Sequence, residues 1–290
     1  GTYHSNDMTP FHLVEGVASE GEKIAYPAPV DQTNLNALYA QKAEQFIAEA
    51  PTDIPLFLYF AHNFPHVPLF ASANEQGRSK AGLYGDVVQG LDNTVGRIVT
   101  ALKQRGKFDN TLIVITSDNG PWWEGRGIGR GRKGETFEGG VHVPFVAHWP
   151  RRLKPAMSDE LVMGSDLLPT LLEELRVVAP GDRKLDGRSI SQTLRGGPSP
   201  HEALYFYGGG TLMAVRQGRY KYRDRKPIVY ATDPVFIPIW GSHGPWLFDM
   251  QTDADEAYDV STHRLDVAAR LKNILDARNT EMDANPRGWK

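Results

Sequence analysis

The 290 residues include no cysteine, so this chain can form neither disulfide bonds nor thiolate metal sites. No run of about 18 or more apolar residues occurs, and we therefore expect no membrane-spanning helix. An excess of charge of one sign is also missing, because 32 Lys and Arg residues stand against 35 Asp and Glu, for a net charge of -3. This balance gives no electrostatic reason to expect nucleic acid or an anionic membrane as a partner. Any anion must be bound by a few cations that point at one place.

The beginning of the chain lacks an initiator Met and both parts of a secretion signal. Residues 1–8 read GTYHSNDM, with neither a basic segment nor an apolar segment. We therefore expect this to be sequence from the middle of a protein.

Alternating helix and strand patterns predict an α/β fold for the first two thirds of the chain. Apolar residues recur at helical spacing in three segments and form short continuous runs in three others. The predicted helices are 33–49, 83–102 and 166–175, and the predicted strands are 54–61, 111–116 and 145–149. Strands that are apolar on both faces are typical of a mostly parallel sheet flanked by helices. Residues 1–31 are turn-rich and polar, and we predict a loop there.

The pattern changes near residue 197, and we predict two domains, residues 1–197 and 198–290. The second is a smaller α+β subdomain with an antiparallel sheet. Its predicted strands are 204–207, 212–216, 220–223 and 246–249, and its predicted helix is 262–282.

Three polar segments adjoin the predicted strands of the first domain, where open α/β sheets bind ligands. They are residues 61–68 (AHNFPHVP), 117–121 (SDNGP) and 131–140 (GRKGETFEGG). Each has an ordinary interpretation when taken alone. A histidine between prolines can close a loop, Asp-Asn-Gly is a common turn, and Gly-rich basic loops are usually solvated.

Together the three segments indicate a site for an anionic ester. Asp118 and Asn119 offer a carboxylate and an amide oxygen, which Ca²⁺ and Mg²⁺ prefer, although two ligands cannot complete a shell. Lys133 offers a compact positive charge on a Gly-flanked loop. His66 offers a proton donor or acceptor. A hard metal, a lysine and a histidine at one point would stabilise anionic oxygens during phosphoryl or sulfuryl transfer.

At this level of detail the chain resembles a known family. The stretches FLYFAHNFPHVPL, LYGDVVQGLDNTVGRIV, TLIVITSDNG and GRKGETFEGGVHVPF are similar, in order and spacing, to the formylglycine-dependent arylsulfatases of the alkaline phosphatase superfamily. GRYKYR and WLFDMQTDADEAYDV resemble that family's C-terminal subdomain. The resemblance covers nearly the whole chain, and it implies an alkaline-phosphatase-like fold.

The resemblance implies a role for five residues. Asp118 and Asn119 match the second pair of ligands of a calcium ion, with Mg²⁺ as the alternative. Lys133 matches the lysine that binds a sulfate oxygen, and His66 the histidine that contacts the sulfate and assists the leaving oxygen. His243 lies where some arylsulfatases place a histidine in the substrate pocket.

The departures from the family concern the nucleophile. The family makes its formylglycine from Cys or Ser in a C/S-x-P/A-x-R motif, and this sequence contains no such motif. The early Asp-Asp metal pair and a Gly-Lys-x-His segment are missing as well. Because the family carries these features nearer the N-terminus, we expect the N-terminal part of the protein to be absent from this chain, and the chain alone to be inactive.

The resemblance implies a sulfuric ester hydrolase that cleaves the sulfate monoester of a small molecule or a carbohydrate. It also favours an exported location, such as the periplasm, the extracellular space or the lysosome. Two alternatives stay open. One is a phosphonate or phosphodiester hydrolase of the same superfamily. The other is a non-catalytic, truncated homologue that binds calcium or a sulfated glycan.

Overall fold

The computed structural model describes residues 12–17, 19–122, 127–225 and 244–284. The chain forms two compact units, residues 1–111 and 112–290, here called the N-terminal and C-terminal units. The domain boundary predicted at residue 197 differs from this division and stays a prediction. Within the described ranges, we find no helix with the length and apolar character of a membrane span.

An antiparallel hairpin opens the N-terminal unit, where the sequence predicted only loop. Strand β1 (Leu13–Val17) pairs with strand β2 (Gly21–Tyr26). The loop prediction was wrong because both strands are largely exposed, so the segment lacks the buried apolar alternation that marks a strand. Even its apolar residues Val14 and Ile24 are 49% and 60% exposed.

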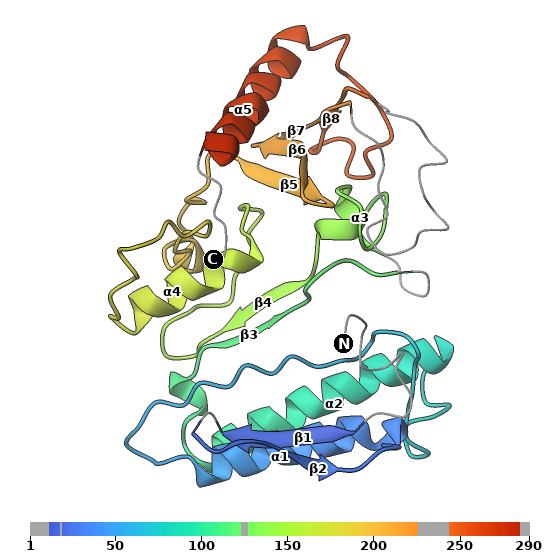
Figure 1. Ribbon diagram of the computed structural model, residues 1–290, viewed down its shortest axis with the longest axis vertical. Helices are drawn as coiled ribbons and strands as arrows, with labels where there is room; N and C mark the ends of the chain where they lie inside the picture. The colour runs from blue at the N-terminus through green and yellow to red at the C-terminus, as the bar shows by residue number, and fades with distance from the viewer. Residues whose placement is uncertain (1–11, 18, 123–126, 226–243, 285–290) are drawn as a thin grey trace. The chain divides into compact units, whose positions relative to one another are not determined.

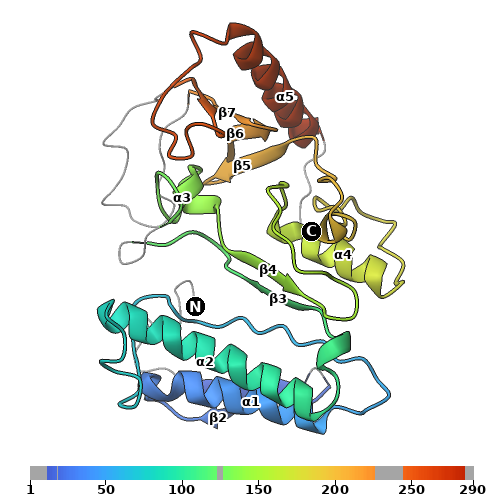
Figure 2. The same cartoon turned by 180° about the vertical axis from the view of Figure 1, so that it is seen from behind.

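Two long helices form the body of the N-terminal unit and confirm the first two helices predicted. Figure 2 shows α1 (Leu35–Glu49) and α2 (Gly82–Gln104) side by side. Arg97 on α2 joins them, because its guanidinium donates to both oxygens of Glu44 on α1 at 2.8 and 2.5 Å. One cluster of buried apolar residues lies near the N-terminal ends of these helices and contains Leu35, Phe64, Ala71 and Val87.

The apolar run at residues 54–61 is not a strand, which corrects the sequence prediction. Leu56 and Leu58 are half-buried, whereas Phe57 and Tyr59 are 67% and 81% exposed. This period of two residues is that of an extended backbone. No strand of the described chain pairs with the segment, however. An apolar sequence favours a buried strand, but a strand also requires a neighbouring strand with which to pair.

Two of the predicted strands open the C-terminal unit and pair with each other. Strand β3 (Ile113–Thr116) runs antiparallel to strand β4 (Phe145–His148). All strand pairs among the described residues are antiparallel, so the parallel pairing predicted for the sheet is not found in this part of the chain. Ile115 and Val146 are 43% and 53% exposed, so burial on both faces was also wrong for this pair.

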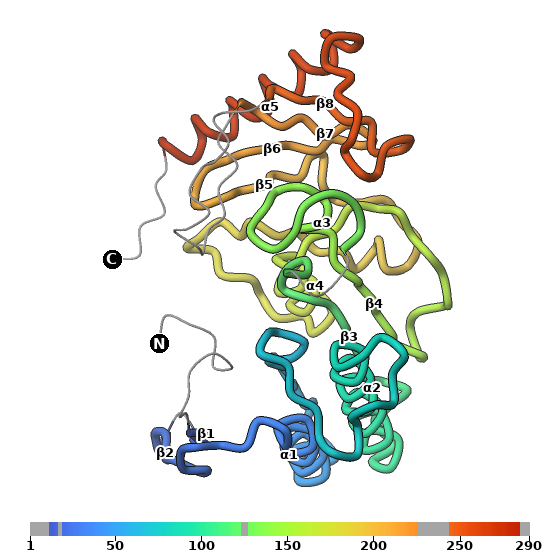
Figure 3. The backbone as a smooth tube through the Cα atoms, turned by 90° about the vertical axis from the view of Figure 1, so that its right-hand side faces the viewer, coloured from blue at the N-terminus to red at the C-terminus, as the bar shows by residue number. Residues whose placement is uncertain are grey.

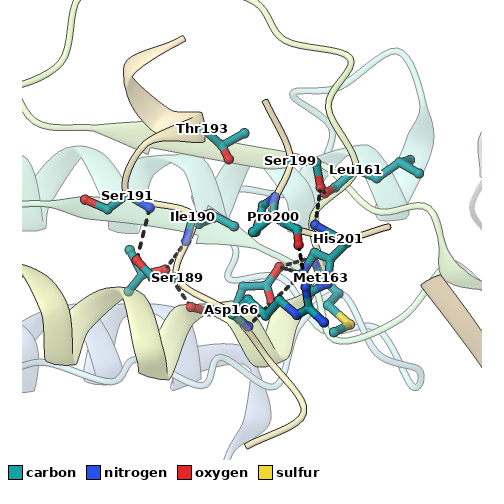
Figure 4. Close-up of polar contacts among 12 residues, drawn as sticks. Leu161, Met163, Asp166, Ser189, Ile190, Ser191, Thr193, Ser199, Pro200 and His201 are labelled. Atoms are coloured by element: carbon teal, nitrogen blue, oxygen red, sulfur yellow. Dashed lines mark hydrogen bonds and ion pairs between the residues drawn. The ribbon is translucent and has the colours of Figure 1, made fainter. Parts of the chain in front are cut away.

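The connection from β4 to the next strand contains helix α4 (Leu167–Glu174), which confirms the helix predicted there. The fully buried carboxylate of Asp166 organises this connection (Figure 4). It accepts the backbone N–H groups of Met163 and Arg188 at 2.8 and 2.9 Å, and His201 Nε2 lies 2.9 Å from each of its oxygens. One carboxylate therefore holds together three parts of a segment that has little regular structure.

A four-stranded antiparallel sheet and a long helix complete the C-terminal unit, as the sequence predicted (Figure 1). The strands, in sheet order, are β5 (Leu204–Gly208), β6 (Thr211–Gln217), β7 (Tyr220–Arg223) and β8 (Trp246–Asp249). Helix α5 (Leu265–Ala284) covers one face of this sheet. The buried residues between them are Leu212, Val215, Tyr222, Leu247, Val267, Leu271 and Leu275.

The other face of this sheet supports a polar loop. Figure 3 shows α5 and the short helix α3 (Glu138–Val141) on either side of the four strands. The ring of Phe137, just before α3, lies 6.1 Å from the ring of Trp246 and 6.4 Å from that of Phe248, centroid to centroid. The loop that carries Lys133 therefore rests on this sheet.

Candidate active site

The two predicted metal ligands follow strand β3 directly. Asp118 is exposed and Asn119 is half-buried. The Ser117 hydroxyl donates to the Asn119 carbonyl at 2.9 Å, and it lies 3.5 Å from Asp118 Oδ1. The turn is thus closed by its own hydrogen bonds, and the carboxylate and the amide stay accessible to a ligand.

Backbone hydrogen bonds join this turn to the loop that carries Lys133. The Lys133 N–H donates to the Pro121 carbonyl at 2.9 Å, and the Gly120 N–H donates to the Gly140 carbonyl at 2.9 Å. These bonds connect both ends of the 131–140 segment to the end of the SDNGP turn. The structure therefore brings the predicted sulfate-binding lysine to the turn that bears both predicted metal ligands.

Glycine is required where the turn and the loop cross. A Cβ atom at Gly120 would lie 2.0 Å from the Gly139 carbonyl oxygen, far inside van der Waals contact. Gly131 and Gly134, on either side of Lys133, have φ angles of +88° and +91°, a region that side chains disfavour. The close approach of the two backbones and the positive φ angles thus favour glycine at these positions, in addition to the turn propensity of glycine.

Phe137 anchors the Lys133 loop to the sheet. Its side chain is 1% exposed, and two guanidinium groups lie near its ring, with Arg130 Cζ 4.3 Å and Arg223 Cζ 5.3 Å from the centroid. Burial and the nearby charge of Arg130 lower the pKa of Arg223. The loop is therefore fixed by a buried aromatic contact as well as by backbone bonds.

Next to Phe137, Glu138 enters a buried cluster of charges. Lys221 Nζ lies 2.9 Å from Glu138 Oε1 and 2.9 Å from Glu256 Oε1. Burial by itself would raise the pKa of Glu138, but the hydrogen bond from His142 and the charge of Lys221 lower it to about 2. Burial raises the pKa of Glu256. We call Glu138, Lys221 and Glu256 the buried ion cluster.

Sequence reasoning missed the buried ion cluster, although strand β7 contains a signal for it. Lys221 and Arg223 alternate with Tyr222, so both cations lie on one face of the strand. Tyr222 packs toward α5, which leaves the two cations on the face that supports the Lys133 loop. Cations that alternate in this way within a buried strand need anionic or aromatic partners.

His66 lies in the N-terminal unit, in the loop that follows residues 54–61. Its side chain is half-buried, and Nδ1 lies 2.5 Å from the Val67 carbonyl oxygen. An Nδ1–H donor to that carbonyl leaves Nε2 as the acceptor nitrogen of the neutral ring. Because His66 and Lys133 belong to different units, their meeting at one site stays a prediction.

The remaining predicted site residue, His243, lies outside the described residues.

The donors near Lys133 fit part of a calcium site. Asp118 and Asn119 are both hard oxygen donors at the end of one strand, and Ca²⁺ takes about six to eight such ligands. Among the described residues, no group of three or more His, Asp or Glu side chains is placed to hold a metal ion. The described chain thus offers two of the required oxygens.

Comparisons with known proteins identify the family to which the chain is similar. The model of the sulfatase family matches residues 4–177. Human arylsulfatase A is 34% identical over 275 residues, which cover 87% of this chain and 52% of that protein. The N-acetylgalactosamine-6-sulfatase of Canis lupus familiaris is 36% identical over 199 residues, which cover 66% of this chain and 38% of that protein.

Solved structures confirm the predicted fold class. The crystal structure of the PsFucS1 sulfatase from Pseudoalteromonas sp. superposes with a TM-score of 0.86 over 95% of this chain and 59% of that chain, at 24% identity. The chain spans about half the length of its arylsulfatase relatives, 47% of one and 52% of another. The family match and the identity to arylsulfatases together show that this chain belongs to the sulfatase family of the alkaline phosphatase superfamily.

Proposed function

We propose that the protein containing this chain hydrolyses sulfate monoesters. The observation that supports this proposal most strongly is the crossing of the two loops in the C-terminal unit. There, backbone hydrogen bonds from the Lys133 N–H to the Pro121 carbonyl and from the Gly120 N–H to the Gly140 carbonyl join the loop of Lys133 to the turn that carries Asp118 and Asn119. A cation and hard oxygen donors at one point suit an ester whose reacting group carries anionic oxygens.

In this proposal each residue of the chain has a distinct task. Lys133 binds a sulfate oxygen and stabilises the charge that develops during transfer. His66, whose Nδ1 faces the Val67 carbonyl, acts through Nε2, which donates a proton to the leaving oxygen from the protonated ring. Asp118 and Asn119 hold one side of a divalent cation, for which we propose Ca²⁺, with Mg²⁺ as the alternative. A bound cation would withdraw charge from the sulfate oxygens.

In this proposal the nucleophile comes from outside this chain. The sequence contains neither cysteine nor a Ser-x-Pro/Ala-x-Arg motif. We propose that a formylglycine on another segment of the same protein supplies it, and that the 290-residue chain is inactive on its own. Peptide mapping of the complete protein by mass spectrometry should identify a C/S-x-P/A-x-R peptide whose Cys or Ser carries the formylglycine mass change.

The relatives support the proposed substrate class, and the resemblance to the family supports the proposed location. One relative is an arylsulfatase and another is named for a sulfated amino sugar. We therefore propose a small-molecule or carbohydrate sulfate ester as substrate, and an exported protein.

The roles of Lys133 and His66 can be tested by alanine substitution in the complete protein. We expect Lys133→Ala and His66→Ala each to lower kcat/KM for 4-nitrophenyl sulfate by at least about a hundredfold, because each removes a group that stabilises the transition state. Initial rates at several substrate concentrations measure the effect.

Two exposed residues provide matched controls. Lys154→Ala and His263→Ala remove the same kinds of side chain from the surface of the C-terminal unit, and we expect unchanged kinetics. Activity within threefold of the parent for Lys133→Ala or His66→Ala would refute the assigned role. A higher kcat/KM for the matched phosphonate ester than for the sulfate ester would favour the phosphonate hydrolase alternative.

A further inference from the structure

The buried ion cluster adjoins the loop that carries Lys133, because Glu138 belongs to both. Its three side chains are almost fully buried, with Glu138 4% exposed and Lys221 and Glu256 each 1% exposed. Removing such charges from water costs several kcal/mol per ion, so a buried cluster is weak evidence of a contribution to stability. Its position next to the candidate site suggests another purpose.

The cluster reaches the loop through a backbone group. Glu256 Oε2 accepts the N–H of Glu138 at 2.6 Å, the first N–H of helix α3. Glu138 is followed by Gly139, whose N–H donates to the Arg130 carbonyl at 2.7 Å. This second bond closes the base of the loop. The carboxylate of Glu256 therefore holds the residue next to the point where the two ends of the Lys133 loop meet.

The backbone of Glu256 adopts an unfavourable conformation at this contact. Its φ angle is +52°, in the left-handed region that is unfavourable for a residue with a side chain. The same turn contacts the other end of the loop, because Arg130 donates to the Glu256 carbonyl at 3.4 Å. A Cβ at Gly129 would lie 2.7 Å from the Ala254 carbonyl oxygen. One strained turn thus contacts both ends of the loop.

The remaining contacts of the cluster balance its charge and exclude water. Glu138 Oε2 lies 3.1 Å from His142 Nδ1 and 3.4 Å from a guanidinium nitrogen of Arg216. The Lys221 ammonium lies 4.5 Å from the ring centroid of Phe206. Lys221 thus lies between the two carboxylates in a buried environment, where electrostatic contacts are strong.

We propose that Glu256 and Lys221 are positioning residues for Lys133. They do not touch the substrate. Instead, Lys221 orients the carboxylate of Glu256, Glu256 fixes the Glu138 N–H, and the closed loop then presents the Lys133 ammonium to an anionic oxygen. The link from loop position to catalysis rests on the proposed sulfatase function, whereas the link from Glu256 to loop position does not.

The test compares three variants of the complete protein. Glu256→Met removes the acceptor of the Glu138 N–H, and Glu256→Gln keeps an acceptor. Leu271→Ala is the matched control, because it destabilises the same unit from the α5 side of the sheet, away from the loop. We expect Glu256→Met to raise both the KM for 4-nitrophenyl sulfate and the inhibition constant of inorganic sulfate about tenfold. Glu256→Gln should stay within about threefold of the parent.

A structural role alone would give a different result. Fewer folded molecules lower the apparent kcat but leave KM and the inhibition constant unchanged, which is what we expect of Leu271→Ala. If Glu256→Met fails to fold, Glu256→Asp provides the same comparison, because its shorter side chain withdraws the carboxylate from the Glu138 N–H. Unchanged KM and sulfate inhibition in an acceptor-removing or shortened variant that folds would overturn the proposal.

Amide hydrogen exchange separates this proposal from the proposed function. We expect faster exchange at residues 130–140 in Glu256→Met than in Leu271→Ala at matched thermal stability. This measurement needs no substrate. A parent protein without sulfatase activity would refute the proposed function. The exchange result would still decide whether Glu256 positions the loop. Equal loop exchange in the two variants would overturn the proposal.

Discussion

At the scale of single residues, His62 shows how the loop that contains His66 is held. His62 Nδ1 accepts the Phe64 N–H at 3.0 Å, and the His62 ring lies among the rings of Tyr39, Phe60 and Phe64. Burial lowers the pKa of His62 to about 4. The neutral ring is therefore the form that the fold accepts, which suits a structural histidine four residues before a proposed catalytic one.

The lowered pKa of His62 predicts a loss of stability in mild acid. A base whose pKa is lower in the folded state contributes stability that is complete above about pH 6.5 and is lost as the pH falls toward 4. We expect the stability advantage of the parent over His62→Asn, whose side-chain oxygen can still accept the Phe64 N–H, to shrink by about 1–2 kcal/mol from pH 7 to pH 4.5. Urea unfolding at the two pH values measures this difference.

The exposed His263 is the control for this measurement. His263→Asn should leave the pH dependence of the parent unchanged. The opposite result is that the parent and His62→Asn differ in free energy of unfolding by the same amount at both pH values. That result would show that the fold accepts the charged ring of His62.

At the scale of elements, the crossing of the SDNGP turn and the Lys133 loop depends on Gly120. Gly120→Ala places a methyl group about 2 Å from the Gly139 carbonyl oxygen, so one backbone must move. We expect the free energy of unfolding to fall by more than about 2 kcal/mol. We also expect kcat/KM of the complete protein to fall at least tenfold, because Lys133 moves with its loop. Thermal unfolding and steady-state kinetics measure the two effects.

Gly164 is a suitable control for the crossing. A Cβ atom at Gly164 meets nothing within 4 Å, and Gly164→Ala should therefore change the stability by less than about 1 kcal/mol. If Gly120→Ala behaves like Gly164→Ala, the two backbones do not approach as closely as described.

The elements that the sequence predicted correctly are those whose own periodicity is strong. Helices α1, α2 and α5 were predicted, as was the antiparallel sheet. The hairpin β1–β2 was missed because exposed strands show little apolar alternation. The segment at residues 54–61 was assigned to a strand from its apolar character alone, although strand formation requires a partner.

The candidate site shows the same limit. The motifs predicted that Asp118, Asn119, Lys133 and His66 meet at one point. The structure joins the loops of the first three by backbone hydrogen bonds, and the meeting with His66 stays a prediction. The buried ion cluster joins residues 83 and 118 positions apart in the sequence, Glu138 with Lys221 and Glu138 with Glu256. No local pattern relates such positions, and only the folded sheet brings them together.

At the scale of the whole molecule, exposed apolar side chains remain on extended segments of both units. Phe57 and Tyr59 lie on one face of the segment at residues 54–61, and they are 67% and 81% exposed. In the C-terminal unit, Ile115 on β3 and Val146 on β4 are 43% and 53% exposed. Extended segments with exposed apolar residues pair readily with other chains.

We therefore expect the 290-residue chain, expressed alone, to self-associate and to unfold without a sharp transition. Replacing Phe57 and Tyr59 together by Lys should lower the association at equal concentration, because charges on an exposed strand oppose pairing. Tyr258→Lys is the control, since Tyr258 is also 74% exposed but lies outside any strand, and it should change nothing. Light scattering over a range of concentrations measures association, and calorimetry measures unfolding. A monodisperse monomer with a sharp, cooperative transition would contradict this expectation. It would show that the described contacts suffice for an independent fold, even with these apolar side chains exposed to water.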